Sequence, residues 1–339
     1  MAAIPEREHS VVAAIYRLYE QREAAEGGHR AHLGASLIGH PCARYLWLTF
    51  HWVGREAFDG RMLRLFQAGR DFEPRAVAEL RAIGCEVHES DEATGQQFRV
   101  SAHGGHFGGS LDAAACGLPE APRAWHVVEF KTHSAKSFKA LMADGVEQAK
   151  PQHYAQMQVY MGLTGMDRAL YLAENKDTSE LYSERVPADP VVFAKLMQHA
   201  HLIIESPEPP QRIHDDPAWW QCKFCAFHGQ CHGQVVPEVN CRTCAHSTPE
   251  PDGDARWSCA RQAAGNALSL AEQRAGCRGH RYIPLLLERL GEQVSAADEL
   301  DGNATVHYRR ADGRGFSNGG HAPALLSQQI AAGEWGGVA

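Results

Sequence analysis

Apolar residues recur at intervals of three and four in four stretches of the chain, the spacing that places them on one face of an α-helix. In the first stretch Val11, Ile15 and Leu18 form such a face, and Gly27 follows as a stop signal. The pattern predicts helices over residues 5–26, 61–83, 148–162 and 190–205.

Short segments bounded by Gly, Pro and polar residues separate these helices, as is typical of β-strands joined by turns. We predict strands over residues 85–89, 97–101, 108–115, 125–131, 169–174 and 180–187. Helices come first, then a meander of strands, then alternating helices and strands. This order predicts an α/β (α+β) fold with a central mixed sheet flanked by helices.

Pro207, Pro209 and Pro210 end the last predicted helix, and little apolar periodicity follows them. Seven of the ten cysteines crowd into residues 222–277, beyond this break. We therefore expect one domain over residues 1–236, a Cys-rich module over 237–285 and a tail over 286–339.

Composition narrows the class of protein. The 339-residue chain is 44% hydrophobic, which is enough to form a core and excludes disorder as its main state. No apolar run approaches the ~20 residues of a membrane span, and the first residues lack the pattern of an export signal. We expect a cytoplasmic protein of a bacterial or phage-infected cell, with no membrane association.

The net charge of -8 argues against a wholly basic nucleic-acid-binding protein, but the lysines are unevenly placed. Four of the seven, including Lys136 and Lys139, fall between residues 131 and 150. We expect Lys136 and Lys139 to belong to a local strip that faces DNA phosphates.

Two acids and a lysine are predicted to project together from neighbouring strands. Alternation along residues 125–131 places Glu129 and Lys131 on one face and Phe130 on the other. Asp112 ends the preceding hairpin arm, where antiparallel pairing can carry it alongside Glu129. Carboxylates bind Mg²⁺ or Mn²⁺, and a nearby ammonium stabilises a phosphodiester under attack. The alternative is an ordinary cross-strand salt bridge.

This arrangement resembles the core of the PD-(D/E)xK nuclease superfamily. Upstream, Gly69 and Glu73 resemble the family's helix in which a Gly is followed four residues later by a His or Glu metal ligand. Downstream, the run from Pro151 to Tyr160 resembles the Gln-and-Tyr helix of RecB-like and phage-type exonucleases. The chain departs from the pattern at Leu111, where a proline is usual, and at Glu73, where many iron-sulfur members carry histidine.

The resemblance implies a restriction-endonuclease-like core that hydrolyses DNA with Mg²⁺ or Mn²⁺. The metal ligands that it implies are Glu73, Asp112, Glu129 and the backbone carbonyl of Phe130. Lys131 then orients the nucleophile or stabilises the transition state, and Gln156 assists.

Three polar residues, Gln152, Gln156 and Tyr160, recur every four residues in the predicted helix over 148–162. They share nearly one helical face, where amides and a hydroxyl can hold a DNA phosphate or the attacking water. The alternative is a polar stripe on the surface.

Three thiols stand at CxxC-x5-C spacing, at Cys222, Cys225 and Cys231. An iron-sulfur cube or a structural zinc ion needs a fourth ligand. Cys42 resembles the N-terminal ligand of iron-sulfur RecB-like nucleases, including AddB-type helicase-nucleases and CRISPR-adaptation nucleases. The resemblance, which covers about residues 30–235, implies that these four residues, the first cysteine group, hold a structural 4Fe-4S cluster. The alternative is zinc held with His228 or His232.

A second cysteine group follows, made up of Cys241, Cys244, Cys259 and Cys277. A CxxC pair with two later cysteines is typical of a tetrahedral zinc site, and a metal supplies the core that this segment lacks. His246 and His280 are substitute ligands. A second iron-sulfur cluster and free thiols are the alternatives, and contact of this module with DNA or a protein is left open.

These features predict a Mg²⁺- or Mn²⁺-dependent DNA exonuclease that acts in DNA recombination, repair or phage DNA processing. A recombinase or a single-strand annealing protein is a candidate partner. The alternatives are a DNA endonuclease, an RNA nuclease and a non-catalytic DNA- or protein-binding module on the same fold. The sequence indicates neither strand polarity nor oligomeric state.

Overall fold

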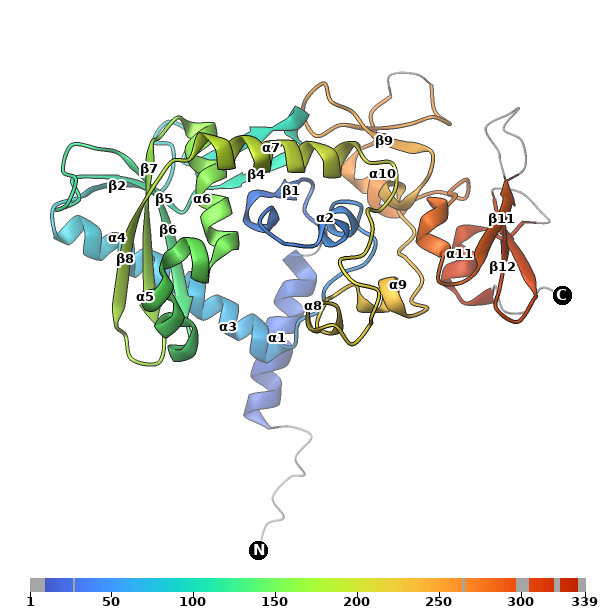
Figure 1. Cartoon of the computed structure of the whole chain (residues 1–339), viewed down its shortest axis with the longest axis horizontal. Coiled ribbons are helices and arrows are strands. Elements are labelled where there is room, and N and C mark those ends of the chain that lie inside the picture. The colour runs from blue at the N-terminus through green and yellow to red at the C-terminus, as the bar shows by residue number, and fades with distance from the viewer. Residues whose placement is uncertain (1–9, 27, 264–265, 297–304, 320–323, 335–339) are drawn as a thin grey trace, which may run out of the picture. The chain divides into compact units, whose positions relative to one another are not determined.

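The computed structural model describes residues 10–26, 28–263, 266–296, 305–319 and 324–334 (Figure 1). The prediction for residues 5–9 and part of that for the tail over 286–339 lie outside these residues. The helices are α1 Val11–Glu26, α2 Ala43–Phe50, α3 Gly60–Arg70, α4 Phe72–Ala82, α5 Ala135–Ala149, α6 Pro151–Thr164, α7 Pro190–Glu205, α8 Trp220–Lys223, α9 His228–His232, α10 Leu270–Ala275 and α11 Ser327–Ala331. In the ranges that are described, no helix has the length and apolar character that crossing a bilayer requires.

The strands include several short ones, as expected from the many turn signals. They are β1 Leu33–Gly34, β2 Glu86–His88, β3 Arg99–Ala102, β4 Phe107–Ser110, β5 Ala113–Cys116, β6 His126–His133, β7 Arg168–Asn175, β8 Leu181–Pro187, β9 Ser247–Pro249, β10 Trp257–Cys259, β11 Glu292–Ala296, β12 Val306–Arg309 and β13 Gly315–Asn318.

The chain divides into two compact units, each built from separate stretches of sequence. The first draws on the described parts of residues 1–28, 57–100 and 109–196. The second draws on those of 29–56, 101–108 and 197–339. The division into three parts along the sequence remains a prediction.

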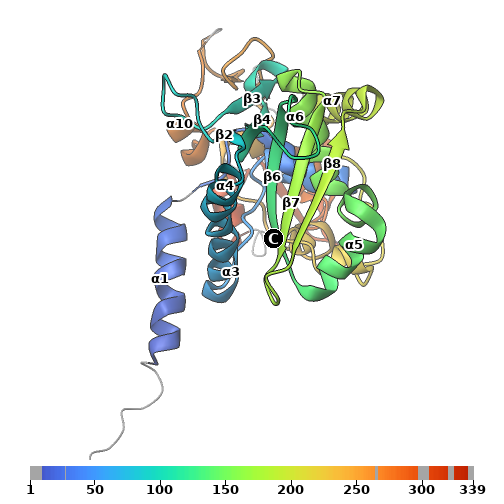
Figure 2. The same ribbon diagram turned by 90° about the vertical axis from the view of Figure 1, so that its left-hand side faces the viewer.

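The first unit contains a five-stranded mixed sheet in the order β2-β5-β6-β7-β8. The central strand β6 pairs antiparallel with β5 and parallel with β7, and both outer pairs are antiparallel. Helix α4 lies on one side of the sheet and α5 on the other (Figure 2). The predicted central mixed sheet with flanking helices is therefore confirmed.

The two faces of β6 differ in chemistry, as its alternating pattern predicts. Val128 and Phe130 belong to a buried apolar cluster with Phe72, Ala76 and Leu80 of α4. The rings of Phe72 and Phe130 meet edge to face, with centroids 6.1 Å apart. Burial of each Val, Leu or Phe side chain in this cluster stabilises the fold by roughly 1.5–3 kcal/mol. This packing anchors β6 to α4 through its apolar face. The opposite face of the strand carries polar side chains.

The prediction of one helix over residues 61–83 is wrong, because α3 and α4 are separate helices that meet at Asp71. Pro74 lies in the first turn of α4 and has no N–H to bond the carbonyl of Arg70. Helix α5, which the sequence did not predict, contains Gly145 in a left-handed conformation with φ 71° that interrupts its pattern.

The single strand predicted over residues 108–115 is two strands, β4 and β5, which leave Leu111 and Asp112 between them. The predicted helix over 148–162 begins and ends slightly later, as α6. The helix over 190–205 agrees with α7.

The second unit contains α2, a short parallel pairing of β1 with the start of β4, the β9-β10 hairpin and the antiparallel sheet β11-β12-β13. Apolar side chains from the last sheet and the segment before it form a separate core. Its buried members are Tyr282, Leu287, Leu290, Val306, Tyr308, Phe316 and Ile330.

Candidate active site and cysteine sites

Glu129 and Lys131 lie together on the face of β6 that is turned away from α4. The side chain of Glu129 is 0% exposed and that of Lys131 is 27% exposed. The Lys131 ammonium donates a hydrogen bond to Glu129 Oε1. The strand therefore holds a buried carboxylate beside a partly accessible cation.

Three oxygen-bearing groups converge on Lys131 Nζ. Besides Glu129, the carbonyl oxygen of Phe130 accepts a hydrogen bond at 3.0 Å, and Asp112 Oδ2 lies 3.9 Å away. These are three of the four groups that the family resemblance assigns to a metal ion. The structure thus brings the predicted acids and lysine together.

Backbone hydrogen bonds hold Asp112 in this place. The amide N–H of Phe130 donates to Asp112 Oδ2 over 2.9 Å. The amide of the preceding residue, Leu111, donates to the carbonyl of Phe98 over 3.0 Å. A proline at this position, as the family usually has, lacks that N–H. The departure from the family pattern therefore adds a hydrogen bond beside Asp112.

Helix α6 supplies a second layer behind Glu129. Gln156 Nε2 donates to Glu129 Oε2 over 3.1 Å and to the Tyr160 hydroxyl over 3.2 Å. Gly109 of β4 lies so close that a Cβ built on it would be 2.6 Å from the Tyr160 hydroxyl oxygen. Only glycine fits there without displacing the tyrosine, so Gly109 leaves room for Tyr160 to keep its hydrogen bond with Gln156.

Glu73 lies in the first turn of α4 and is half-buried. Burial and the negative charge of Asp112 raise the pKa of Glu73 to about 7, and Lys131 opposes the rise. Glu73 is therefore close enough to Asp112 and Lys131 for their charges to change its pKa.

The charge balance of this cluster favours a cation. Burial raises the pKa of Glu129 to about 7, while Lys131 opposes that rise and Asp112 adds to it. Burial alone lowers the pKa of Lys131, but Glu129 and Asp112 outweigh it and the net shift is upward. With its carboxylates ionised, the cluster carries more negative charge than one ammonium neutralises, which a divalent cation relieves.

A polar network that the sequence did not predict lies on the same side of the sheet. The Tyr171 hydroxyl is 2.8 Å from His133 Nε2 and 2.8 Å from His153 Nδ1. Tyr171 pairs with Glu129 across the β6-β7 ladder. The two-residue spacing of Glu129, Lys131 and His133 is a signal that could have identified His133, whereas Tyr171 requires the strand pairing.

The residues proposed to contact DNA lie in different surroundings. Lys136 and Lys139 are exposed in the first half of α5, and Gln152 is half-buried near the start of α6. Tyr160 is 2% exposed and bonds Gln156, so it does not present its hydroxyl at the surface. The alternative of a polar surface stripe on α6 is wrong, because Gln156 is also buried.

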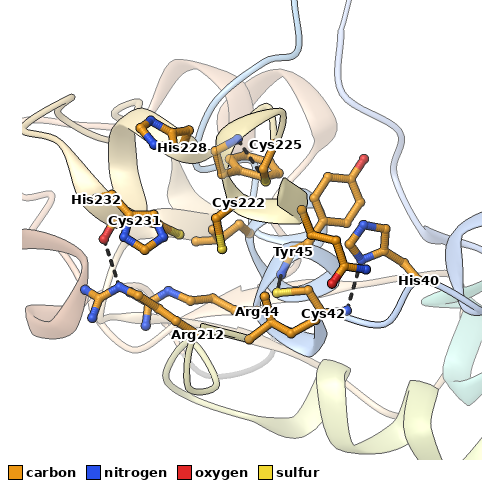
Figure 3. A pocket seen from close by; sticks show the side chains of 14 residues that line it. His40, Cys42, Arg44, Tyr45, Arg212, Cys222, Cys225, His228, Cys231 and His232 are labelled. Carbon is orange, nitrogen blue, oxygen red and sulfur yellow. Dashed lines mark hydrogen bonds between the residues drawn. The ribbon is translucent and has the colours of Figure 1, made fainter. Parts of the chain in front are cut away.

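The four thiols of the first cysteine group line one pocket in the second unit (Figure 3). Cys42 caps the N-terminus of α2, and the other three come from α8, α9 and the link between them. Two regions far apart in the sequence thus supply the set. His228 and His232 line the same pocket, so the zinc alternative also has its ligands at hand.

Hydrogen-bond donors and cations lie around these thiols, although burial raises the pKa values of three of them, Cys222, Cys225 and Cys231. The amide of Tyr45 donates to Cys42 Sγ and that of Phe227 to Cys225 Sγ, both over 3.4 Å. Burial raises the pKa of the Cys231 thiol, and the guanidinium groups of Arg44 and Arg212 oppose that rise. The four thiols, the N–H donors and the nearby cations together fit an anionic metal cluster.

All ten cysteines lie among the described residues, and none of them forms a disulfide bond. The second cysteine group lies in the second unit, on the 3₁₀ turn Cys241–Thr243 and the residue after it, at the end of β10 and just after α10. Within the described part of the chain, no group of three or more His, Cys, Asp or Glu side chains has the geometry of a metal-ion site. The metal assignments for both groups and for the acidic site are therefore proposals.

No family model and no curated protein matches the chain. Solved structures with some likeness include an alkaline exonuclease, LHK-Exo, from Laribacter hongkongensis, at 17% identity and TM-score 0.34, covering 55% of this chain and 90% of that one. LHK-Exo in complex with dAMP is 16% identical, with TM-score 0.37, and the likeness covers 56% of this chain and 89% of that one. A phage related exonuclease from Haemophilus somnus is 16% identical, with TM-score 0.37, and the likeness covers 53% of this chain and 95% of that one. These likenesses are distant, with TM-scores below 0.5.

Proposed function

We propose that this protein is a metal-dependent deoxyribonuclease with a restriction-endonuclease-like core. The observation that carries the proposal is the convergence of Glu129, Asp112 and the Phe130 carbonyl on Lys131 Nζ. An ordinary cross-strand salt bridge on an exposed strand does not require a carboxylate that is 0% exposed and whose second oxygen accepts from Gln156. Burying a carboxylate is costly unless it is paired and hydrogen-bonded, and such buried, paired acids are frequent at functional sites.

The residues that would hold Mg²⁺ or Mn²⁺ are Glu73, Asp112, Glu129 and the carbonyl of Phe130. Carboxylate and carbonyl oxygens are the hard ligands that both ions prefer. Bound there, the ion would supply Lewis acidity and would lower the pKa of an attacking water. In the metal-free protein the pKa values of Glu73 and Glu129 are raised to about 7, so metal binding there displaces protons that ordinary glutamates would already have lost.

Lys131 and Gln156 serve the reaction through fixed positions. Lys131 keeps its charge at neutral pH, so Nζ can bind a phosphate oxygen and stabilise the negative charge that develops there. Gln156 donates to Glu129 Oε2 and so holds the carboxylate in one orientation.

We propose DNA as the substrate and digestion from an end as the mode of action, in recombination, repair or phage DNA processing. The exposed Lys136 and Lys139 supply positive charge for a phosphate backbone. A recombinase or single-strand annealing protein is the proposed partner.

We also propose that the first cysteine group holds a 4Fe-4S cluster with a structural role. The cluster would join α2 to α8 and α9, and closing so long a stretch of chain removes entropy from the unfolded state. Anaerobically purified protein is then expected to contain about four iron and four sulfide per chain. One zinc per chain at this group, without sulfide, would support the alternative ligand set with a histidine.

The nuclease proposal is tested by incubating the protein with end-labelled linear, nicked and closed-circular DNA, with and without Mg²⁺ or Mn²⁺. We expect metal-dependent loss of linear DNA, abolished in Lys131→Ala and retained in Lys195→Ala, which removes an exposed lysine of α7. The order of label release gives the polarity. Cutting of closed circles would make the protein an endonuclease, and tight DNA binding without any cleavage would favour a binding module.

A further inference from the structure

A tight turn presents the first two thiols of the second cysteine group. Asn240 caps this turn, and its side chain accepts hydrogen bonds from the amides of Arg242 and Thr243 at 2.9 and 3.2 Å. The Cys244 amide donates to the Cys241 carbonyl over 3.1 Å. A closed CxxC turn of this kind typically supplies two neighbouring ligands of a structural zinc site.

The β9-β10 hairpin brings Cys259 to this turn. Cys259 is the last residue of β10 and pairs with Ser247, the first of β9. The Ser247 amide donates to the Cys244 carbonyl over 3.1 Å, and the Ala260 amide donates to the His246 carbonyl over 2.8 Å. The third cysteine therefore lies beside the chain that leaves Cys244.

The loop after α10 brings Cys277 to the other side of the turn. Cys241 Sγ lies 3.5 Å from the carbonyl oxygen of Glu272 in α10. Gly276, with φ 59°, approaches so closely that a Cβ on it would lie 3.3 Å from the carbonyl oxygen of Val239. Three separate segments thus carry the four cysteines to one place.

A zinc ion binds four thiols as thiolates and displaces their protons. Cys277 is exposed and Cys241 and Cys259 are half-buried, so their side chains have room to turn toward a common ion.

The same turn inserts Arg242 into an aromatic cage formed by Phe50, Trp52 and Trp257. The guanidinium carbon lies 5.4, 3.7 and 4.7 Å from their ring centroids. Arg242 is 1% exposed and donates to the carbonyls of Phe50 and Ala31 at 3.1 and 2.9 Å. Two of the cage rings and both of these carbonyls belong to the N-terminal part of the second unit.

We propose that the second cysteine group binds one zinc ion through four thiolates, and that the ion locks the turn that keeps Arg242 in the aromatic cage. Zinc is therefore a structural clamp on residues 29–56, the segment that also carries Cys42. The proposal goes beyond the nuclease activity and does not depend on it.

The test is the metal content of the full-length protein and of two variants, Cys277→Ser and Cys116→Ser. Cys277 is exposed, so its replacement is not expected to prevent folding, and Cys116 of β5 is the matched control. Each protein is measured for bound zinc, for the absorption of its Co²⁺-substituted form, and for hydrogen exchange over residues 43–53.

We expect one zinc per chain in the wild type and in Cys116→Ser, and at least tenfold weaker zinc retention in Cys277→Ser. The Co²⁺ form should show the strong sulfur-to-cobalt charge-transfer band of a thiolate site. Exchange over residues 43–53 should rise in Cys277→Ser alone. Zinc retained in Cys277→Ser, or a second iron-sulfur cluster in place of zinc, would each overturn the proposal. Unchanged exchange after zinc loss would overturn the clamp.

Discussion

The side-chain amide of Gln156 donates to Glu129 Oε2 over 3.1 Å, which links the buried carboxylate of β6 to helix α6. The same nitrogen also donates to the Tyr160 hydroxyl over 3.2 Å. Through these two bonds, α6 fixes how Glu129 faces the proposed metal site.

Replacing Gln156 by leucine should lower the rate of DNA hydrolysis by roughly 10- to 100-fold, because the hydrogen bond that orients the Glu129 carboxylate is lost. Circular dichroism and thermal unfolding should show a folded protein. The control is Gln158→Leu, which removes hydrogen bonds to Pro187 and Asp189 and should weaken the fold without lowering the rate. Equal rates for Gln156→Leu and the wild type would contradict the role of Gln156.

Gly109→Ala should destabilise the protein by about 1–3 kcal/mol, because the new methyl group overlaps Tyr160. Removing the hydroxyl in the double variant Gly109→Ala/Tyr160→Phe should recover part of this loss. Urea unfolding of the four proteins of the cycle measures the coupling. Strictly additive effects would show that the two residues are not in contact.

Glu73 should make the metal-free protein less stable as pH rises. Its pKa is raised to about 7 from an ordinary value near 4.5, so the folded state holds a proton that the unfolded chain has released. The stability is present below about pH 4.5 and is lost as pH rises through 7. After allowance for solvent, Glu73→Gln should gain about 1–2 kcal/mol over wild type at pH 8 and little at pH 4. Unfolding at both pH values checks this, and a gain independent of pH would contradict it.

His153, unlike Glu73, should make the protein less stable as pH falls. Burial and the charge of Lys131 lower its pKa to about 3, so the unfolded chain takes up a proton before the folded state does. The stability is complete above about pH 6.5 and declines as pH falls toward 3. His153→Gln should flatten the loss of stability between pH 7 and pH 5, measured by urea unfolding. An unchanged slope would show that His153 does not titrate on unfolding.

Arg242→Lys should cost about 2–5 kcal/mol, because an ammonium replaces neither the planar fork nor the stacking within the aromatic cage. Arg278→Lys, at an exposed position, should change stability by less than about 0.5 kcal/mol. Chemical denaturation of both variants provides the comparison. If Arg242→Lys were as stable as the wild type, a positive charge alone would be sufficient at this position.

Residues close together in sequence were the most predictable. The two-residue period of a strand correctly separates Glu129 and Lys131 from Phe130, and the hairpin before β6 correctly brings Asp112 near. The break between α3 and α4 was missed, because apolar spacing continues through it although Pro74 interrupts the hydrogen bonds.

Features made by distant segments could not be predicted. Tyr171 reaches His133 and His153 only because β7 pairs in parallel with β6, and periodicity does not reveal the partner of a strand. The aromatic cage of Arg242 is assembled from α2, the residues after it and β10, and no local pattern around Arg242 indicates these distant partners.

Mn²⁺ binding measured by electron paramagnetic resonance tests whether the acids around Lys131 form a metal site. The wild type should bind Mn²⁺ in competition with Mg²⁺, and Asp112→Asn and Glu129→Gln should each weaken binding at least tenfold. Glu147→Gln, at an exposed acid of α5, should bind as the wild type does. Undiminished binding in both Asp112→Asn and Glu129→Gln would contradict the account.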